Sequence, residues 1–225
     1  NVVSVSVPGN REKVLDLMRK EDKAVLPVVK GDTKQLVGLI TRSDLILNPD
    51  EEQIAILMST DLVTASPDDD VKDVAKKMID NNVRRVPVVD DNGDLVGIIT
   101  SFDLVSNALI KLESDDPVEN FMITTVPTTW YKTPLNVAFE TMKQFGLKSV
   151  LALNDSAKLV GILTETDFIE ESEIISERSE HSSTVGTEGD KWSWDSTSVL
   201  YIEKNCLKFT DKLVEDVGTH KVEVV

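Results

Sequence analysis

The chain has 225 residues, of which 40% are hydrophobic, and its formal net charge is -16 at pH 7. This composition can form a globular core, whereas the negative charge argues against binding to a nucleic-acid phosphate backbone. The apolar runs are too short to span a membrane, and one cysteine and two histidines leave little for a disulfide framework, a metal site or His-based catalysis. We therefore expect a soluble, cytoplasmic protein with no membrane contact and no enzyme activity.

The first elements along the chain are a strand at residues 2–5 and a helix whose apolar side chains share one face. Two β-branched runs follow, at residues 25–29 and 36–41, and they have the length and composition of strands. The second run ends in Thr41, which opens another helix with Asp44 three residues later. The first unit is therefore predicted as strand, helix, strand, strand, helix.

The same order recurs twice along the chain. The string Leu-Val-Gly-apolar-apolar-Thr-x-x-Asp stands at residues 36–44, 95–103 and 159–167. Repetition at such spacing indicates repeated supersecondary units. The expected elements of the later copies are a strand at 62–65, a helix after Pro67, strands at 86–89 and 95–100, a strand near 125–128, a helix after Pro134, and strands at 150–153 and 159–164.

Several features of the repeats have a structural explanation. The acidic runs at residues 68–70 and 90–94 lack the full spacing of a calcium loop, so we interpret them as a helix start and a hairpin turn. A glycine inside a strand indicates close approach of another chain segment, a bulge or a ligand. We expect tight packing between paired sheets at Gly38, Gly97 and Gly161, and we do not count the glycines as ligand residues.

The sequence changes character after the third copy. Residues 170–197 are polar and lack periodicity, which predicts a loop. A short hairpin is expected after it, with its turn at residues 203–205. Trp192 and Trp194 are expected to pack on one face at its edge, and Cys206 to be a small buried residue. Residues 213–225 then predict the start of a fourth unit, including a first strand.

These motifs together resemble those of the cystathionine-β-synthase (CBS) domain family. The match rests on the threefold glycine string ending in Thr-x-x-Asp, on the strands Leu26–Val29 and Val86–Val89, and on segments such as Ile54–Thr60 that lead into each unit. The resemblance covers nearly all of residues 1–171 and the segment 213–225. It implies an α+β fold of tandem repeats, with small mixed sheets packed pairwise and helices outside.

The expected domain boundaries follow from the resemblance. Three repeats occupy residues 1–50, 51–112 and 113–171, and the first of them lacks an N-terminal lead-in. Residues 172–212 form a polar insertion with a hairpin, and residues 213–225 start a truncated fourth repeat. The chain is thus expected to be a fragment of a four-repeat protein.

The resemblance also implies a regulatory function. Family members bind adenosine-containing ligands such as AMP, ADP, ATP or S-adenosylmethionine in clefts between paired repeats, and four-repeat members are similar to the energy-sensing γ subunit of AMP-activated protein kinase. We expect an archaeal free-standing sensor that requires no cofactor, assembles as a homodimer or disc, and signals to a protein effector. The alternatives are a protein specific for S-adenosylmethionine and a structural or dimerisation module with degenerate pockets.

The Thr-x-x-Asp motif allows two interpretations. Threonine at a helix start with an acid at the third helical position forms a capping box, which needs no ligand. The family resemblance implies in addition that the carboxylate holds ribose hydroxyls, because it can accept from both at once. We assign the aspartates to ribose and the threonines to the phosphate side.

The residues just before the second strand of each unit differ between the copies. Arg84 and Arg85 occupy this place in the second copy, Lys148 in the third and Ala24 in the first. Arginine forks suit phosphate groups, so the site that uses Arg84 and Arg85 is expected to bind phosphates best. The alternative is a solvated strand start paired with nearby aspartates. A site that depends on Ala24 is expected to bind weakly or to prefer a less charged ligand.

The full set of candidate ligand-binding residues combines both motifs with three positions that the resemblance adds, Thr64, Ala65 and Pro87. The set is Thr41, Asp44, Thr64, Ala65, Arg84, Arg85, Pro87, Thr100, Asp103, Lys148, Thr164 and Asp167.

Overall fold

The computed structural model describes residues 2–107, 116–184, 197–209, 211–219 and 222, with the side chains of residues 177–206 left aside. Trp192 and Trp194 therefore lie outside the described residues, as do the side chain of Cys206 and all but Val222 of the strand expected near the C-terminus. None of the described helices is long and apolar enough to cross a membrane.

Repeat 1 (residues 2–47) has the predicted order of elements. They are β1 (Val5–Val7), α1 (Arg11–Lys20), β2 (Val25–Lys30), β3 (Leu36–Thr41) and α2 (Arg42–Leu47). In the sheet, β2 lies between a parallel β1 and an antiparallel β3. Asn10 caps α1 by accepting a hydrogen bond from the Lys13 N–H at 3.3 Å. The buried face of α1 includes Val14 and Met18, which the helical spacing indicated.

Repeat 2 (residues 61–107) contains α4 (Val71–Asp80), β4 (Arg85–Val89), β5 (Leu95–Thr100) and α5 (Ser101–Asn107), and α3 (Ile54–Leu57) leads into it. The strand predicted at residues 62–65 is reduced to one parallel bridge between Ala65 and Val88. Here the Ala65 N–H donates to the Pro87 carbonyl at 3.0 Å. The acidic runs behave as expected, since Asp70 caps α4 and Asp90 accepts backbone hydrogen bonds across the turn.

Repeat 3 (residues 125–171) repeats the order once more. Its elements are β6 (Thr128–Trp130), α6 (Leu135–Phe145), β7 (Ser149–Leu153), β8 (Leu159–Thr164) and α7 (Glu165–Glu171), and the 3-10 turn η2 (Val118–Asn120) precedes them. The strands β1 and β6 lie about three residues later than the sequence predicted. They start where a partner strand is available, because Val5 pairs with Val28 and Thr128 with Leu151.

The insertion after repeat 3 differs from the prediction. Strand β9 (Ser172–Thr184) pairs along its whole length with the antiparallel strand β10 (Thr197–Phe209), so residues 172–184 are no loop and residues 203–205 are no turn. The register sets Glu203 opposite Arg178 and Lys204 opposite Glu177. Backbone pairing does not depend on side-chain type, so polar residues can form strands here without an apolar alternation.

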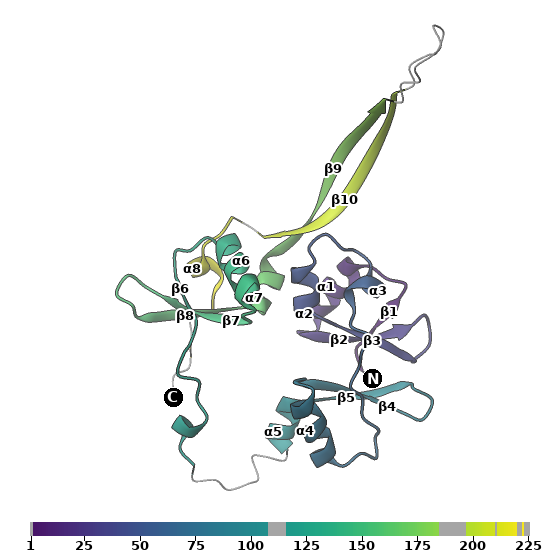
Figure 1. The fold of residues 1–225 in the computed structure, drawn as a ribbon, viewed down its shortest axis with the longest axis vertical. Helices are drawn as coiled ribbons and strands as arrows, with labels where there is room; N and C mark the ends of the chain where they lie inside the picture. The colour runs from purple at the N-terminus through teal and green to yellow at the C-terminus, as the bar shows by residue number, and fades with distance from the viewer. Residues whose placement is uncertain (1, 108–115, 185–196, 210, 220–221, 223–225) are drawn as a thin grey trace.

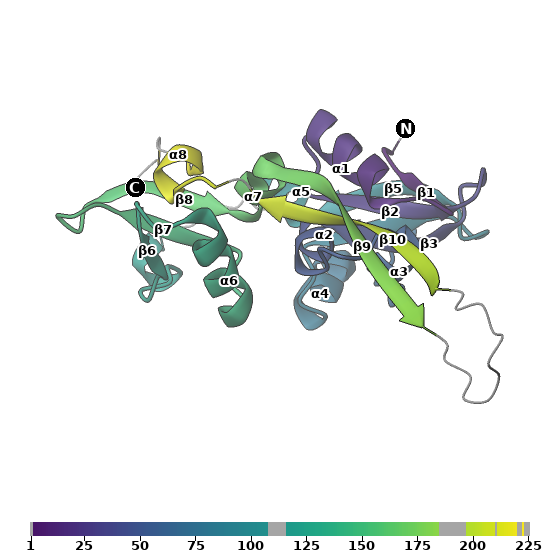
Figure 2. The same cartoon turned by 90° about the horizontal axis from the view of Figure 1, so that it is seen from above.

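The repeats pack against one another in two different ways. Repeats 1 and 2 pair through their sheets, where the Leu36 N–H donates to the Gly93 carbonyl at 3.1 Å and the Leu95 N–H donates to the Lys34 carbonyl at 2.8 Å. Repeats 1 and 3 meet through helices, because Arg19 in α1 donates to the Ile169 carbonyl in α7. Figures 1 and 2 show repeat 3 beside repeat 1 and the β9–β10 ribbon projecting past both.

The hydrophobic core follows this packing. One cluster runs through repeats 1 and 3, and it includes Leu45 from α2, Phe168 from α7 and Leu207 from the base of β10. Repeat 2 has a separate and smaller cluster around Val74 and Val86. We infer that repeats 1 and 3 form the most stable part of the molecule, since buried apolar area is the main favourable contribution to folding.

Gly38 is closely packed, but against the segment after α3 and not against a paired sheet as the sequence predicted. A Cβ atom at this position would lie 2.6 Å from the sulfur of Met58 and 3.1 Å from the Ser59 carbonyl oxygen. In contrast, a Cβ at Gly97 would meet only Val88, at 3.4 Å. All three sheets also show a register shift beside the glycine's partner, for example between Val88 and Val89. The glycine string thus combines a bulge with tight packing in repeat 1 and a bulge alone in repeat 2.

Candidate functional site

Each Thr-x-x-Asp motif forms the capping box that the sequence predicted. The Asp44 carboxylate accepts from both the backbone N–H and the hydroxyl of Thr41, each at 2.7 Å. Asp103 accepts the same two bonds from Thr100 at 2.8 and 2.6 Å. In repeat 3, Thr164 donates to Asp167 at 2.6 and 2.8 Å. The motif therefore has a structural role in all three repeats.

The capping bonds use only part of each aspartate. In every repeat both donors of the threonine reach the same carboxylate oxygen, Oδ2. Oδ1 of Asp44 and of Asp103 is therefore not used by the cap, and a carboxylate oxygen can accept further hydroxyl groups. Each threonine hydroxyl already donates its hydrogen to the aspartate Oδ2. A contact between threonine and phosphate would require that hydrogen to turn away from the cap.

Ala24, Arg84 and Lys148, which precede β2, β4 and β7, are held in the same way in the three repeats. The Arg84 carbonyl accepts a hydrogen bond from the Ser101 N–H at 2.8 Å, which ties the strand start to the first residue of α5. The Ala24 and Lys148 carbonyls accept equivalent bonds from Arg42 and Glu165. The fold thus places the side chains at these three positions beside the Thr-x-x-Asp helices, as the sequence alignment implied.

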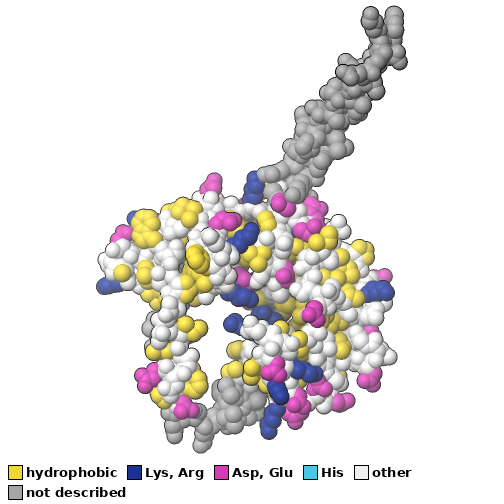
Figure 3. Space-filling model, viewed as in Figure 1, with side chains coloured by type: hydrophobic (Ala, Val, Ile, Leu, Met, Phe, Trp, Pro, Cys, Tyr) yellow, Lys and Arg dark blue, Asp and Glu magenta, His cyan; other side chains and the backbone are white. Residues whose placement is uncertain are grey.

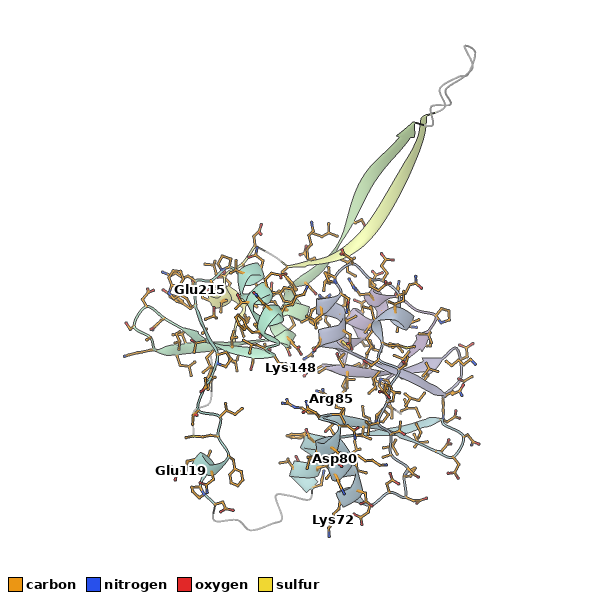
Figure 4. All side chains as sticks on the ribbon, viewed as in Figure 1. Lys72, Asp80, Arg85, Glu119, Lys148 and Glu215 are labelled. Atoms are coloured by element: carbon orange, nitrogen blue, oxygen red, sulfur yellow. The ribbon has the colours of Figure 1, made fainter. Side chains whose placement is uncertain are left out.

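Arg85 lies in a cluster of like charges where the three repeats meet. Burial lowers the pKa of Arg85 below its ordinary value, and the guanidinium groups of Arg42 and Arg84 lower it further, whereas Glu165 acts in the opposite direction. Figure 4 places Arg85 near the centre of the molecule and close to Lys148, and Figure 3 shows dark-blue side chains gathered around the central hollow. Such a concentration of positive charge favours an anion.

Arg42 is a member of this cluster that the sequence-based set missed. It follows Thr41, and its guanidinium donates to the Thr166 hydroxyl of repeat 3 at 2.5 Å and to the Asp22 carboxylate at 3.1 Å. Its side chain is 11% exposed, and its Nε is buried without a hydrogen-bond partner among the described residues. The sequence offered one signal, a cation between Thr41 and Asp44, but only the fold brings Arg42 near Arg85.

The cleft between repeats 1 and 2 is a second candidate site. It has a volume of about 560 Å³, within the range of pockets that hold small molecules. Repeat 1 and repeat 2 both contribute to its walls, which are formed by Val2, Val3, Glu21, Lys23, Val25, Pro27, Gly97 and Ile98. The walls are mainly apolar, and the one cation is accompanied by one acid. None of these residues belongs to the sequence-based set, although Pro27 occupies in β2 the place that Pro87 occupies in β4.

The remaining predicted residues are distributed over different parts of the molecule. Thr64, Ala65 and Pro87 lie together at the edge of the repeat 2 sheet, because Ala65 pairs with the strand that contains Pro87. Asp103 is exposed, whereas Asp167 is buried, and Lys148 is exposed. The fold therefore brings Arg85 of repeat 2 near Arg42 of repeat 1 and Lys148 of repeat 3, whereas Thr64, Ala65 and Pro87 lie at the edge of the repeat 2 sheet.

Three copies of one α+β unit, with the sheets of repeats 1 and 2 paired, define a class of tandem-repeat proteins. The CBS domain family model matches residues 1–50, 52–109 and 118–173, and the chain therefore belongs to the CBS domain family. The tandem fold and the family match together confirm the architecture that the sequence motifs predicted.

Similar proteins come mainly from archaea. The chain is 23% identical over 188 residues to the protein MJ1225 of Methanocaldococcus jannaschii, a match that covers 75% of this chain and 67% of the relative. The crystal structure of MJ1225, proposed to be an archaeal homologue of g-AMPK, has a TM-score of 0.68 over 76% of this chain and 68% of that one. A conserved protein from Pyrococcus horikoshii is 27% identical with a TM-score of 0.50 over 76% of this chain.

A further relative matches over a shorter stretch. The protein MK0525 of Methanopyrus kandleri is 36% identical over 85 residues, which is 35% of this chain. The match spans 43% of the length of MK0525.

Proposed function

We propose that the chain is a regulatory module that binds AMP, ADP or ATP between its CBS repeats, in an archaeal, cytoplasmic energy-sensing role. The observation that carries this proposal is the cluster of Arg42, Arg84 and Arg85 in a chain whose net charge is -16. Like charges held together repel one another; the carboxylates of Asp22 and Glu165 counter this repulsion in part, and a bound anion would counter it further. A phosphorylated ligand would offset this repulsion, so the cluster favours the phosphate end of a nucleotide.

The roles of the residues follow from their chemistry. The guanidinium groups can hold phosphate oxygens in bidentate geometry. The unused Oδ1 of Asp44 can accept the ribose hydroxyls, because the capping box occupies only the other oxygen. The edge formed by Thr64, Ala65 and Pro87 lies in the same repeat as Arg85 and offers backbone and apolar atoms to a base. Arg42 links the ribose-binding Asp44 of repeat 1 to the phosphate-binding Arg85 of repeat 2, since it lies two residues before Asp44 and near Arg85.

The cleft of about 560 Å³ suits a ligand of lower charge. It contains Lys23 and Glu21, whose charges offset each other, and Ala24 stands where repeat 2 has Arg84. A nucleoside or S-adenosylmethionine meets these conditions better than a triphosphate. S-adenosylmethionine is therefore the second candidate ligand, because the walls of this cleft are mainly apolar and include no arginine.

A panel of ligands in a thermal-shift assay tests the proposed function. A ligand that binds only the folded chain at about 100 times its dissociation constant adds about 2.7 kcal/mol of stability. For a chain of this size that corresponds to roughly 5–10 °C in Tm. We expect ATP, ADP or AMP to produce this shift, GTP to produce a smaller one, and S-adenosylmethionine to act independently of ATP. The absence of a shift with every adenosine compound would leave a structural module without ligand as the better account.

Asp103→Ala separates the capping role from a ligand role. Loss of the cap is expected to reduce stability by about 1 kcal/mol. If Asp103 also holds a ribose, the variant should bind its adenosine ligand more weakly by about 1.5–3 kcal/mol, because hydrogen bonds to a charged group are lost. Calorimetric titration of the variant measures the second effect and thermal unfolding the first. Unchanged affinity together with reduced stability would assign Asp103 to the cap alone.

A further inference from the structure

A groove lies between the outer side of α6 and the base of β10, which are adjacent in Figure 1. Its volume is about 570 Å³, within the range of pockets that hold small molecules. Repeat 1 contributes Pro49, and the other lining residues belong to α6 and to the chain at the end of β10. None of the candidate nucleotide-binding residues lines this groove, so it is a separate site.

The walls of the groove are held in place by backbone hydrogen bonds. The Leu207 N–H donates to the Pro49 carbonyl at 2.9 Å, which ties β10 to repeat 1. Beyond β10, the Lys212 carbonyl accepts from the Leu135 N–H at 2.8 Å, and the chain then enters α8 (Val214–Val217). The groove is therefore formed by the fold itself and needs no ligand to assemble it.

The outer face of α6 differs from the same face of α1 and α4. The three helices can be aligned on a buried methionine, which is Met18, Met78 or Met142. The α6 residues that line the groove include one charge and are Asn136, Val137, Glu140, Thr141 and Gln144. Their equivalents in α4 are all charged, namely Lys72, Asp73, Lys76, Lys77 and Asp80. Those in α1 include a single uncharged residue and are Glu12, Lys13, Asp16, Leu17 and Lys20. A helix face that meets only water is typically charged, so the loss of charge on α6 indicates contact with something less polar.

The groove offers apolar and aromatic surface to a ligand. Val137 on α6 is 50% exposed, although it stands where α1 has Lys13 and α4 has Asp73. Phe209 is half-buried, and its ring lies 4.5 Å from the ring of the buried Phe139. Burial of such surface favours a ligand with an apolar body.

The charges of the groove favour a cation. Glu140 belongs to α6 and Asp211 to the opposite wall after β10, and Lys208 is the one cation in the lining. Both acids are exposed, and neither carboxylate forms a hydrogen bond or ion pair with another described residue. Aromatic ring faces also attract cations. A positively charged ligand therefore fits this groove, whereas a nucleotide phosphate would be repelled by the two acids.

We propose that this groove binds a small organic cation, an ammonium or guanidinium group carried on an apolar body. The charged group pairs with Glu140 and Asp211, and the apolar body packs on Val137 and Phe209. Because the two acids belong to different walls, a bound ligand connects α6 to the base of the ribbon. The inference rests on the shape and charge of the groove and does not depend on nucleotide binding.

Three probes that share a benzyl group test the chemistry of the groove. Benzylammonium carries a positive charge, benzyl alcohol is neutral and phenylacetate carries a negative charge. Ligand-observed NMR titration of the 225-residue chain measures their affinities. For so small a ligand we expect benzylammonium to bind with a Kd of about 1–10 mM. Benzyl alcohol should bind at least about threefold more weakly, and phenylacetate at least about tenfold more weakly.

Matched variants in α6 and α1 locate the binding site. Val137→Trp fills the groove and should abolish binding, whereas Lys13→Trp places the same side chain at the equivalent exposed position of α1 and should leave it unchanged. Glu140→Gln should weaken benzylammonium binding about three- to tenfold, because one charge partner is lost. Asp16→Asn removes the equivalent acid of α1 and serves as the control for net charge.

Equal affinity for the three probes, or no binding of benzylammonium up to about 20 mM, would overturn the proposal. Equal weakening by Asp16→Asn and Glu140→Gln would also overturn it, because the effect would then come from net charge. A dimer in sedimentation that Val137→Trp abolishes would instead assign the groove to a second copy of the chain. ATP binding to Val137→Trp is measured in parallel and should be unchanged, so that failure of this site and failure of the nucleotide site are seen separately.

Discussion

Replacement of Arg85 by alanine is expected to weaken ATP binding about 10- to 150-fold, because the phosphate loses charge-assisted hydrogen bonds of about 1.5–3 kcal/mol. The unliganded protein should be at least as stable as the natural chain, since the variant removes a half-buried cation that lies near Arg42 and Arg84. Calorimetric titration and thermal unfolding measure the two effects. This opposite behaviour of affinity and stability distinguishes a ligand-binding arginine from a structural one.

Two further variants serve as controls for Arg85→Ala. Arg85→Lys keeps the charge but loses the planar fork, so it should recover only part of the affinity. Lys72→Ala removes an exposed cation on α4, far from the central hollow in Figure 4, and should leave affinity unchanged. If Lys72→Ala and Arg85→Ala weakened binding equally, the effect would come from net charge and the proposed phosphate site would be wrong.

Phe168→Ala is expected to cause the largest loss of stability, about 3–5 kcal/mol, or roughly 6–20 °C in Tm. Phe168 is fully buried in α7, and its ring lies 5.3 Å from the rings of both Phe139 and Phe209. The cluster joins repeat 3 to the base of β10 within the core shared with repeat 1. The substitution therefore leaves a cavity where three parts of the chain meet.

Phe102→Ala is the matched control, because it removes the same side chain from the exposed face of α5. It should change the free energy of unfolding by no more than about 0.5 kcal/mol. Thermal and denaturant unfolding of both variants provide the comparison. A loss below about 1 kcal/mol for Phe168→Ala would mean that the aromatic cluster does not anchor repeat 3 and the ribbon to the core.

The repeated units were predictable because each carries its own local signals. The glycine string, the Asn92-Gly93 turn and the capping box act over a few residues, and the structure confirms β2–β3, β4–β5 and β7–β8 together with their helices. The first strands were placed less well, because a three-residue parallel strand is defined by its partner and not by its own sequence.

The β9–β10 ribbon was not predictable from hydrophobic periodicity. The sequence of β9 is mainly polar and lacks the alternation of apolar and polar residues that identifies a half-buried strand. The apolar residues of β10 suggested two short strands with a turn at residues 203–205. Backbone pairing with β9 decides the outcome, and the paired residues lie 13 (Thr197 and Thr184) to 37 (Phe209 and Ser172) positions apart in the sequence.

The candidate site was predicted only in part. The sequence identified Arg84 and Arg85 because they stand at a repeated position, and Asp44 because it belongs to a motif. It could not identify Arg42 or the walls of the repeat 1–repeat 2 cleft, since these depend on which repeats pack through sheets and which through helices. Internal symmetry in a sequence does not specify that choice.

Calorimetric titration of the 225-residue chain with ATP tests the central claim most directly, at about 50 mM and 300 mM salt. We predict saturable binding that weakens as salt increases, because arginine–phosphate attraction is screened, and that is lost when Arg84 and Arg85 are both replaced by alanine. The account would be contradicted if neither AMP, ADP nor ATP bound at either salt concentration up to about 1 mM ligand, or if the double variant bound ATP as tightly as the natural chain.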